Sequence, residues 1–279
     1  MAFNSLVSVL TDENLVEEVL THAVAAARAH DAHLDVLCMG VDRTQTGYYY
    51  AGASAVVLEE TISRARQEAD EIEAAARKIL SGSDIRWGTE SGMSQMIDLG
   101  RHVAGRARYS DLAILPQPYG EGRGAELEAV TEATLFEGHA PALVLPVGGS
   151  VNPVPKRIMI GWNESVEALS SVRAALPLLQ QADVVHVVVV DPPAHGPARS
   201  DPGGLLSQYL ARHGVKVEID VLSKTLPRVS DVLNRHGEDM EADMIVMGAY
   251  GHSRFREAIF GGATRYMLEE AALPVFMAH

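Results

Sequence analysis

Cysteine, aromatic residues and long apolar runs are scarce in this chain. The single cysteine, Cys38, excludes an intramolecular disulfide and a cysteine-based metal cluster. Aromatic residues make up 5% of the chain, and Ala, Val and Leu dominate its 47% of hydrophobic residues, which suits helices packed on sheets. No apolar run approaches the roughly 20 residues of a transmembrane helix. Because the first residues also lack the basic and apolar regions of a signal peptide, we expect a cytoplasmic protein.

Basic residues are few as well. The chain carries 23 Lys and Arg against 37 Asp and Glu, a net charge of -14. This balance argues against non-specific binding to nucleic acid and against docking on anionic membranes, so we expect neither as a partner. The 11 histidines show no ligand spacing such as two on one helical face, and we therefore predict no metal site.

The sequence contains an internal repeat. Residues 111–115, Asp-Leu-Ala-Ile-Leu, parallel residues 243–247, Asp-Met-Ile-Val-Met, and the Pro-Ala-Leu-Val that begins at Pro141 parallels the Pro-Val-Phe-Met that begins at Pro274. The stretch around residues 149–155 is rich in Gly and Pro, as linkers are. We therefore expect a first domain over residues 1–148, a linker over 149–155 and a second domain over 156–279.

Both halves alternate strand and helix patterns, with nearly continuous apolar strand runs. Such runs are typical of parallel strands whose two faces are both covered by helices. We therefore predict an α/β protein with two tandem doubly wound parallel five-stranded sheets, Rossmann-like in architecture. The expected strands are residues 6–10, 34–39, 84–87, 112–115, 142–147, 157–161, 184–190, 215–222, 244–247 and 274–277. The expected helices lie near residues 13–29, 55–80, 94–107, 125–137, 166–180, 203–213, 229–237 and 262–271.

A glycine motif follows the fourth predicted strand of the second half. Its glycines are Gly248, Gly251, Gly261 and Gly262, and the last of them opens a predicted helix. Glycines at a strand end and at a helix N-terminus let backbone N–H groups approach phosphate oxygens. The motif is neither a Walker loop nor the dinucleotide fingerprint, because its glycines are spaced differently. It predicts a phosphate-bearing ligand at this edge of the sheet.

In this motif the chain resembles the universal stress protein family, in its tandem form. The resemblance rests on Gly-x2-Gly-x9-Gly after the fourth strand and on the closing run that starts at Leu273. It extends to the stretch 158–168, Ile-Met-Ile-Gly-Trp-Asn-Glu-Ser-Val-Glu-Ala, and is strong from about residue 156 onward. It implies an adenine-nucleotide-binding fold, with a stress-response role.

The resemblance also implies a set of binding residues. The ligand would be ATP, or ADP or AMP, with Mg²⁺ entering only through the phosphates. The two glycine segments would hold phosphates and ribose, and the backbone near Val189 would meet the adenine. The residues assigned to the site are Gly248, Gly251, His252, Gly261, Gly262, Ala263, Thr264, Asn163, Ser165 and Val189.

Two positions depart from the family pattern. Asn163 stands where the family usually has Asp, so an amide replaces a carboxylate acceptor. Gly262 stands where a Ser or Thr usually follows the third glycine, and Thr264 offers a hydroxyl nearby. The first half departs further, because prolines replace its first glycine region and Glu126 opens its last helix. We therefore expect a degenerate first domain that pairs with the second as an internal pseudo-dimer, with further homodimerisation left open.

The function that follows is a nucleotide-dependent sensor or regulator. We assign no catalytic residue, because no acid–base pair or metal cluster accompanies the motif, and any ATPase activity should be slow. One alternative is a nucleotide-free interaction scaffold whose glycines only permit tight packing. Another is a ligase-like or hydrolytic enzyme of the same fold group, for which the sequence offers no catalytic set.

Three further residues have structural interpretations. Ser165 precedes a predicted helix and reads as an N-cap rather than as a nucleophile. His186 lies in an apolar strand and reads as a hydrogen-bonded core residue. Cys38 lies within a predicted strand and reads as a buried thiol rather than as a redox site. His252 is the one histidine inside the motif, and ligand contact and plain exposure are equally consistent with its position.

Overall fold

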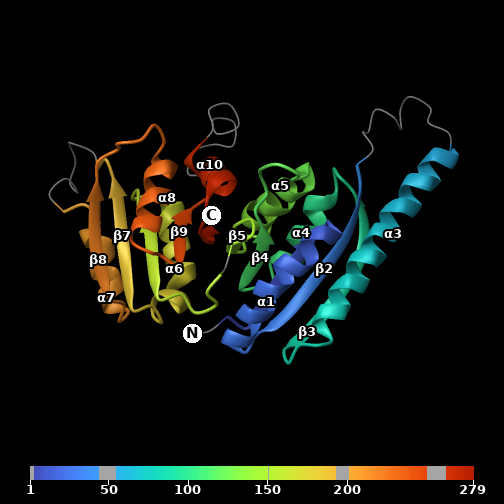
Figure 1. Ribbon diagram of the computed structural model, residues 1–279, viewed down its shortest axis with the longest axis horizontal. Coiled ribbons are helices and arrows are strands. Elements are labelled where there is room, and N and C mark those ends of the chain that lie inside the picture. The colour runs from blue at the N-terminus through green and yellow to red at the C-terminus, as the bar shows by residue number, and fades with distance from the viewer. Residues whose placement is uncertain (1–2, 44–54, 150, 193–200, 250–261) are drawn as a thin grey trace. The chain divides into compact units, whose positions relative to one another are not determined.

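The computed structural model describes residues 3–43, 55–149, 151–192, 201–249 and 262–279 (Figure 1). It divides into two compact units. The N-terminal unit comprises Phe3–Pro118 and Gly122–Ala140. The C-terminal unit comprises Tyr119–Glu121 and Pro141–His279, so it takes two segments from the first half of the sequence.

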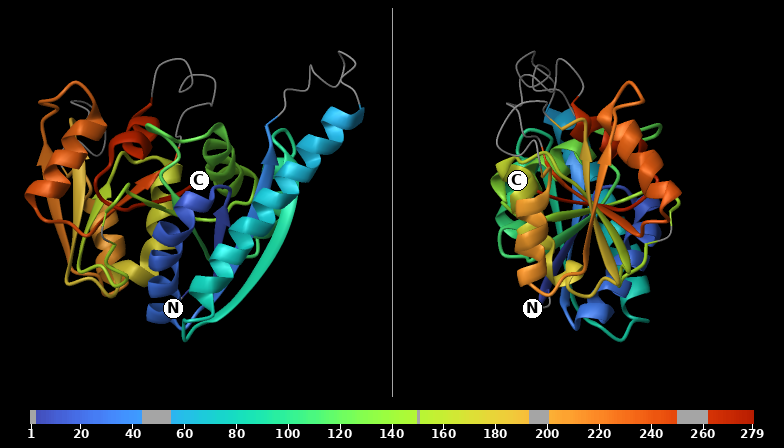
Figure 2. Two further views of the ribbon diagram at one scale, coloured as in Figure 1. Left: turned by 45° about the vertical axis from the view of Figure 1, so that its right-hand side comes forward. Right: turned by 90° about the vertical axis from the view of Figure 1, so that its left-hand side faces the viewer.

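The N-terminal unit is built on four parallel strands in the order β3-β2-β1-β4. Helix α1 packs against α3, and α4 packs against α5. These two pairs cover opposite faces of the sheet, as right-handed crossovers require for this strand order (Figures 1 and 2). The elements are β1 (Ser5–Leu10), α1 (Val16–His30), β2 (His33–Asp42), α3 (Ala55–Leu80), β3 (Arg86–Gln95), α4 (Leu99–Ala107), β4 (Leu112–Pro116) and α5 (Ala125–Glu132).

The C-terminal unit has the strand order β5-β10-β9-β6-β7-β8, and its helices α8 and α10 pack together. All pairings are parallel except that of β5 with β10, which is antiparallel and joins Leu143 to Phe276. The elements are β5 (Ala142–Leu145), β6 (Arg157–Gly161), α6 (Val166–Leu179), β7 (Val184–Val190), α7 (Gly204–Arg212), β8 (Val217–Leu222), α8 (Val229–Asp239), β9 (Met244–Gly248), α10 (Ala263–Glu270) and β10 (Val275–Ala278).

The central strands are apolar because helices cover both of their faces. Every residue of β9 before Gly248 is buried, and so are Ile158, Met159 and Ile160 of β6. Burying one such side chain contributes about 1.5–3 kcal/mol relative to leaving it exposed. The predicted α/β fold with a mainly parallel open sheet is confirmed.

The repeated aspartate has the same structural role in each unit. Asp111 accepts hydrogen bonds from the backbone N–H groups of Asn4 and Ser5, at 2.7 and 3.0 Å. Asp243 does the same for Lys156 and Arg157, at 2.6 and 2.8 Å. In both units the carboxylate that precedes one central strand therefore fixes the start of its neighbour.

The largest error in the predicted elements concerns β3. It was expected over residues 84–87 but extends over Arg86–Gln95, so that α4 begins at Leu99 instead of near residue 94. Beyond Trp87 its residues are Gly, Thr, Glu, Ser and Gln with a single apolar residue, Met93, which hides the strand from a pattern search. A polar strand is stable here because β3 lies at an edge and pairs with β2 along its whole length.

No helix among the described residues is long and apolar enough to cross a lipid bilayer. The longest described helix, α3, is amphipathic. Its residues Ala65, Ala69, Ile72 and Ala76 are buried, while most of the residues between them are exposed. This helix lies directly on β2 and β3. The buried seam therefore packs the helix on its own sheet.

The contact between α3 and β2 depends on Gly40. A Cβ atom at this position would overlap the Ala65 carbonyl oxygen and lie 3.1 Å from the Ala69 nitrogen. We expect Gly40→Ala to lower the free energy of unfolding by about 3 kcal/mol, because backbone must move to admit the methyl group. Urea unfolding followed by circular dichroism measures this change.

Gly105→Ala is the matched control. Gly105 lies inside α4, and among the described residues no atom beyond its chain neighbours and the helix's own backbone is within 4 Å of the position of an added Cβ. We expect this change to raise stability by about 0.5–1 kcal/mol through the helix preference of Ala. Equal effects of the two substitutions would contradict the close approach at Gly40.

Candidate functional site

The candidate site of the C-terminal unit lies where β6, β7 and β9 end. Strand β6 pairs with β7 on one side and with β9 on the other, and Gly161 is level with Met247 and Val188. The chain leaves β6 towards β7 but later returns to its other side, which makes this a topological switch point. Ligands of open α/β sheets bind at such points, at the carboxyl ends of the strands.

The turn that follows β6 is held by two of the predicted site residues. The Asn163 side-chain oxygen accepts a hydrogen bond from the Ser165 N–H at 3.1 Å, and the Ser165 hydroxyl oxygen accepts one from the Ala168 N–H at 3.1 Å. Ser165 is the N-cap of α6, which confirms that structural interpretation. The side chains of both residues thus order the start of α6.

Gly248 ends β9 against the same helix. A Cβ at this position would lie 2.5 Å from the Ala168 nitrogen and 2.8 Å from the Glu167 carbonyl carbon. The strand end and the first turn of α6 therefore touch through backbone atoms, and packing alone requires a glycine. The structure brings Asn163, Ser165 and Gly248 together around this turn, whereas the buried Val189 side chain faces α7, near Gly203.

The remaining predicted residues surround the start of α10. Gly262 is the N-cap, Ala263 is the first helical residue and Thr264 is buried. The first turn of α10 contains no acidic residue and has Arg265 as its third residue. The first N–H groups of a helix lack intrahelical partners and carry partial positive charge. Gly251, His252 and Gly261 lie outside the described residues.

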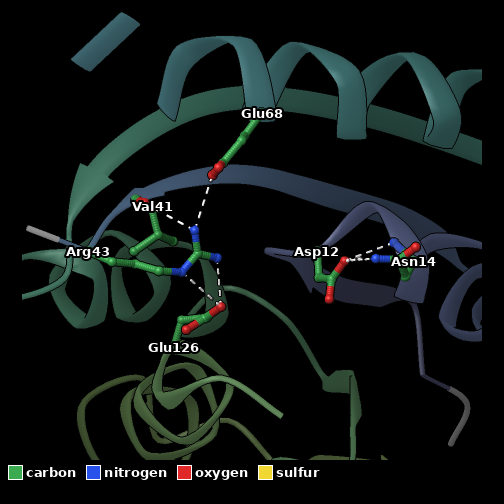
Figure 3. Close-up of polar contacts among 6 residues, drawn as sticks. All are labelled: Asp12, Asn14, Val41, Arg43, Glu68 and Glu126. Atoms are coloured by element: carbon green, nitrogen blue, oxygen red, sulfur yellow. Dashed lines mark hydrogen bonds and ion pairs between the residues drawn. The ribbon is translucent and has the colours of Figure 1, made fainter. Parts of the chain in front are cut away.

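The N-terminal unit repeats the first turn but not the helix start. Asp12 accepts a hydrogen bond from the Asn14 N–H at 2.9 Å, as Asn163 does from Ser165 (Figure 3). The carboxylate that the resemblance expects at Asn163 is therefore present in the other unit. The same Asp12 carboxylate oxygen also accepts a hydrogen bond from the Asn14 side-chain amide at 2.9 Å, so both of these hydrogen bonds lie within the turn.

The start of α5 carries its own anion. Glu126, in the first turn, is buried and accepts hydrogen bonds from Arg43 Nη2 and Nε at 2.7 and 3.2 Å (Figure 3). Arg43 follows β2 and also contacts Glu68 of α3 at 3.2 Å. The hydrogen bond to Glu126 raises the pKa of Arg43 even though partial burial opposes it. This carboxylate stands where a phosphate would approach the helix.

Sequence reasoning identified Glu126 only as a repulsive charge and missed Arg43. The two residues are far apart in the chain, and no local pattern links them. One signal could have indicated their contact. Arg43 immediately follows β2, and the carboxyl end of that strand lies at the same edge of the sheet as the start of α5. Tyr119 and Arg265 were missed for the same reason; the Arg265 guanidinium carbon lies 4.7 Å from the centroid of the Tyr119 ring.

His186 belongs to a hydrogen-bonded cluster beneath α8. Its Nδ1 lies 3.0 Å from the Asp220 carboxylate, and His236 Nε2 lies 3.0 Å from the same oxygen. The prediction that His186 is a satisfied residue is confirmed. Within the described part of the chain, no three His, Cys, Asp or Glu side chains are arranged to hold a metal ion.

Comparison with known proteins identifies the family to which the second half of the chain is similar. Residues 155–279 match the profile of the universal stress protein family. This stretch, a little under half of the chain, is therefore a universal stress protein domain. A universal stress protein of Synechocystis is 31% identical over 106 residues, which is 38% of this chain and 33% of that relative. The chain thus matches only about a third of that relative's length.

Two solved structures have the same fold over nearly the whole chain. A universal stress protein from Archaeoglobus fulgidus aligns over 98% of this chain and 95% of its own, with a TM-score of 0.65 and 15% identity. A candidate universal stress protein from Pseudomonas aeruginosa aligns over 99% and 93%, with a TM-score of 0.61 and 14% identity. At this identity the likeness establishes the fold, which here extends beyond the family-matching residues.

Cys38 is excluded as a reactive centre near these sites. The side chain is fully buried, and burial, with a contribution from Glu73, raises the pKa of its thiol to about 12. We expect no reaction of the folded protein with Ellman's reagent at pH 8, because the thiolate is the nucleophile. One thiol per chain should react after denaturation in guanidinium, and rapid stoichiometric labelling of the native protein would contradict this.

The Arg43–Glu126 pair gives a second prediction. We expect Arg43→Met to lower the free energy of unfolding by about 2 kcal/mol, because it leaves the buried Glu126 carboxylate with one partner fewer. The loss should be smaller than that for breaking a fully buried ion pair, since Arg43 itself is half-exposed. The double variant Arg43→Met/Glu126→Leu should recover most of the loss, since it removes the buried charge. Urea unfolding measures both changes.

Arg101→Met is the control for this pair. Its ion pair with Asp98 is on the surface, where the Arg101 side chain is 85% exposed, so removing it should change stability by less than about 0.5 kcal/mol. If the double variant were as unstable as Arg43→Met, the buried charge would not be the cause of the loss.

Proposed function

We propose that the C-terminal unit binds an adenine nucleotide, ATP or its products ADP and AMP, at the start of α10. The observation that carries this proposal is the first turn of that helix, which has a glycine N-cap, no acidic residue and a basic third residue. An anion completes such a turn, because free N–H groups and the helix dipole both favour negative charge. The match of residues 155–279 to the universal stress protein family supports the adenine nucleotide as the source of that anion.

The role that follows is regulatory. We propose that nucleotide binding acts as a signal in a stress response, with at most slow hydrolysis. Near the start of α6, the described side chains of Asn163 and Ser165 bind backbone N–H groups and offer no general base. Mg²⁺ would reach the site through the phosphates and would add electrostatic stabilisation to them.

The stoichiometry should be one nucleotide per chain. In the N-terminal unit, the buried Glu126 supplies negative charge at the start of α5, and a phosphate there would meet a carboxylate of the same sign. Repulsion between like charges in a partly buried setting disfavours a second nucleotide. Two nucleotides per chain would contradict this assignment.

One observation favours the alternative of a nucleotide-free scaffold. Gly248 is explained by its contact with Ala168, so this motif glycine needs no ligand. On that view the unit would use its surface to contact other proteins. The two functions differ in whether the purified protein carries or takes up nucleotide.

The first experiment is to denature freshly purified protein and identify released nucleotides by mass spectrometry, followed by calorimetric titration of the emptied protein with ATP. We expect about one ATP or ADP per chain and a rise in melting temperature on adding ATP, as binding to the native state requires. Absence of released nucleotide, of heat and of a melting shift would favour the scaffold.

Substitutions in the glycine motif locate the site. Gly251→Val and Gly261→Val should each weaken ATP binding by about tenfold or more, the loss expected for one hydrogen bond to a charged group. Gly105→Ala in the N-terminal unit is the control and should leave ATP affinity unchanged. Wild-type affinity in both valine variants would show that the nucleotide binds elsewhere.

A further inference from the structure

Tyr119 connects the first half of the sequence to the candidate site. It follows β4 in the chain but belongs to the C-terminal unit, where its side chain is only 9% exposed. The guanidinium carbon of Arg265 lies 4.7 Å from the centroid of its ring. This distance is within the range of a cation–π contact, which strengthens when the ring is shielded from water.

Arg265 carries an unusual charge for its position. As the third residue of α10, it places a cation at the positive end of the helix dipole, which is unfavourable unless an anion is nearby. Among the residues that the structure describes, no carboxylate forms an ion pair with Arg265. By contrast, the first turn of α5 contains Glu126 and Glu128. The two helix starts thus have opposite charge.

The cation–π contact holds Arg265 through the attraction between its charge and the ring, not through a hydrogen bond to an acceptor atom. The guanidinium N–H donors therefore keep their capacity to bind oxygen acceptors. Those donors match two phosphate oxygens in a bidentate arrangement, and a guanidinium that is already held in place loses less freedom on binding. Tyr119 can therefore raise affinity without touching the ligand.

We propose that Arg265 binds the phosphates of the nucleotide and that Tyr119 is the positioning residue that holds it there. This inference rests on the proposed function. It assigns a role to the first half of the chain, which supplies Tyr119 and also β5, the antiparallel partner of β10. The residues that match the family profile begin at 155 and include neither, so they do not contain the whole site.

The test measures the affinities of the full-length protein for ATP and for adenosine, the latter by competition. Tyr119→Leu keeps apolar bulk but removes the ring, and it should weaken ATP binding by about threefold to thirtyfold, the range of a cation–π contact. Adenosine affinity should stay unchanged, because adenosine has no phosphate. Tyr119→Phe, which keeps the ring face, should restore ATP affinity.

Arg265→Gln completes the comparison. It should weaken ATP binding by about tenfold or more and leave adenosine binding unchanged. Adding Tyr119→Leu to Arg265→Gln should have no further effect, since the ring acts through the guanidinium. Tyr109→Leu is the matched control, because Tyr109 is 80% exposed in the N-terminal unit and should leave both affinities unchanged.

Each outcome separates the inference from the proposed function. If wild-type protein binds ATP and Tyr119→Leu binds it equally well, the positioning role is wrong and the nucleotide site stands. If Tyr119→Leu weakens ATP and adenosine equally, Tyr119 is a packing residue only, and the inference is wrong. If wild-type protein binds no ATP, both fail. Should Tyr119→Leu not fold, equal losses of ATP and adenosine affinity in Arg265→Gln would overturn the inference.

Discussion

The C-terminal unit depends on the antiparallel pairing of β5 with β10. Strand β10 is four residues long, and without β5 its outer backbone groups would form an open sheet edge, which invites pairing with other chains. The pairing joins Ala142 to Met277 and Val144 to Val275, all of them buried. On its other side β10 supports β9, whose end carries Gly248. A segment from the first half of the sequence therefore stabilises the strands that lead to the candidate site.

Opposite charges distinguish the two helix starts that the repeat places in corresponding positions. Helix α5 has a buried glutamate that Arg43 neutralises, so its N–H groups and dipole are matched from within the chain. Helix α10 has a cation and no acid in its first turn, so that an external anion would be needed for the same match. Corresponding helices thus acquire two different electrostatic environments through a few side chains, while Asp111 and Asp243 keep the same role in the two units.

The fold could be predicted from the sequence wherever the signals were local. Strands β6 and β7 were predicted to the residue, because each is a continuous apolar run bounded by polar residues or glycine. The Ser165 cap was also predicted, since a serine before an apolar helical stripe is a local signal. Strand β3 was predicted poorly because an edge strand with polar residues is specified by its partner β2 and not by its own pattern.

The candidate site was less predictable, because its electrostatics depend on residues distant in sequence. Arg43 and Glu126 are 83 residues apart and meet only in the folded N-terminal unit, and Tyr119 reaches Arg265 from a distant part of the sequence. The antiparallel β5–β10 pairing is equally non-local, since it joins strands from the two halves of the sequence. Sequence reasoning correctly placed Gly248 at a strand end and Gly262 at a helix start, but it could not decide what either glycine does.

A glycine in a binding motif can be required either by a ligand or by close packing of the backbone. Gly248 is required by the backbone of α6 whether or not a ligand binds, because a Cβ there would lie 2.5 Å from the Ala168 nitrogen. Its presence therefore cannot separate a nucleotide site from a packed scaffold. The first turn of α10 bears more directly on this choice, since an arginine at the positive end of a helix is unfavourable without a nearby anion, which a bound phosphate would supply. The physical case for a nucleotide thus depends on Arg265 and on the ring that holds it more than on the glycines by which the motif is recognised.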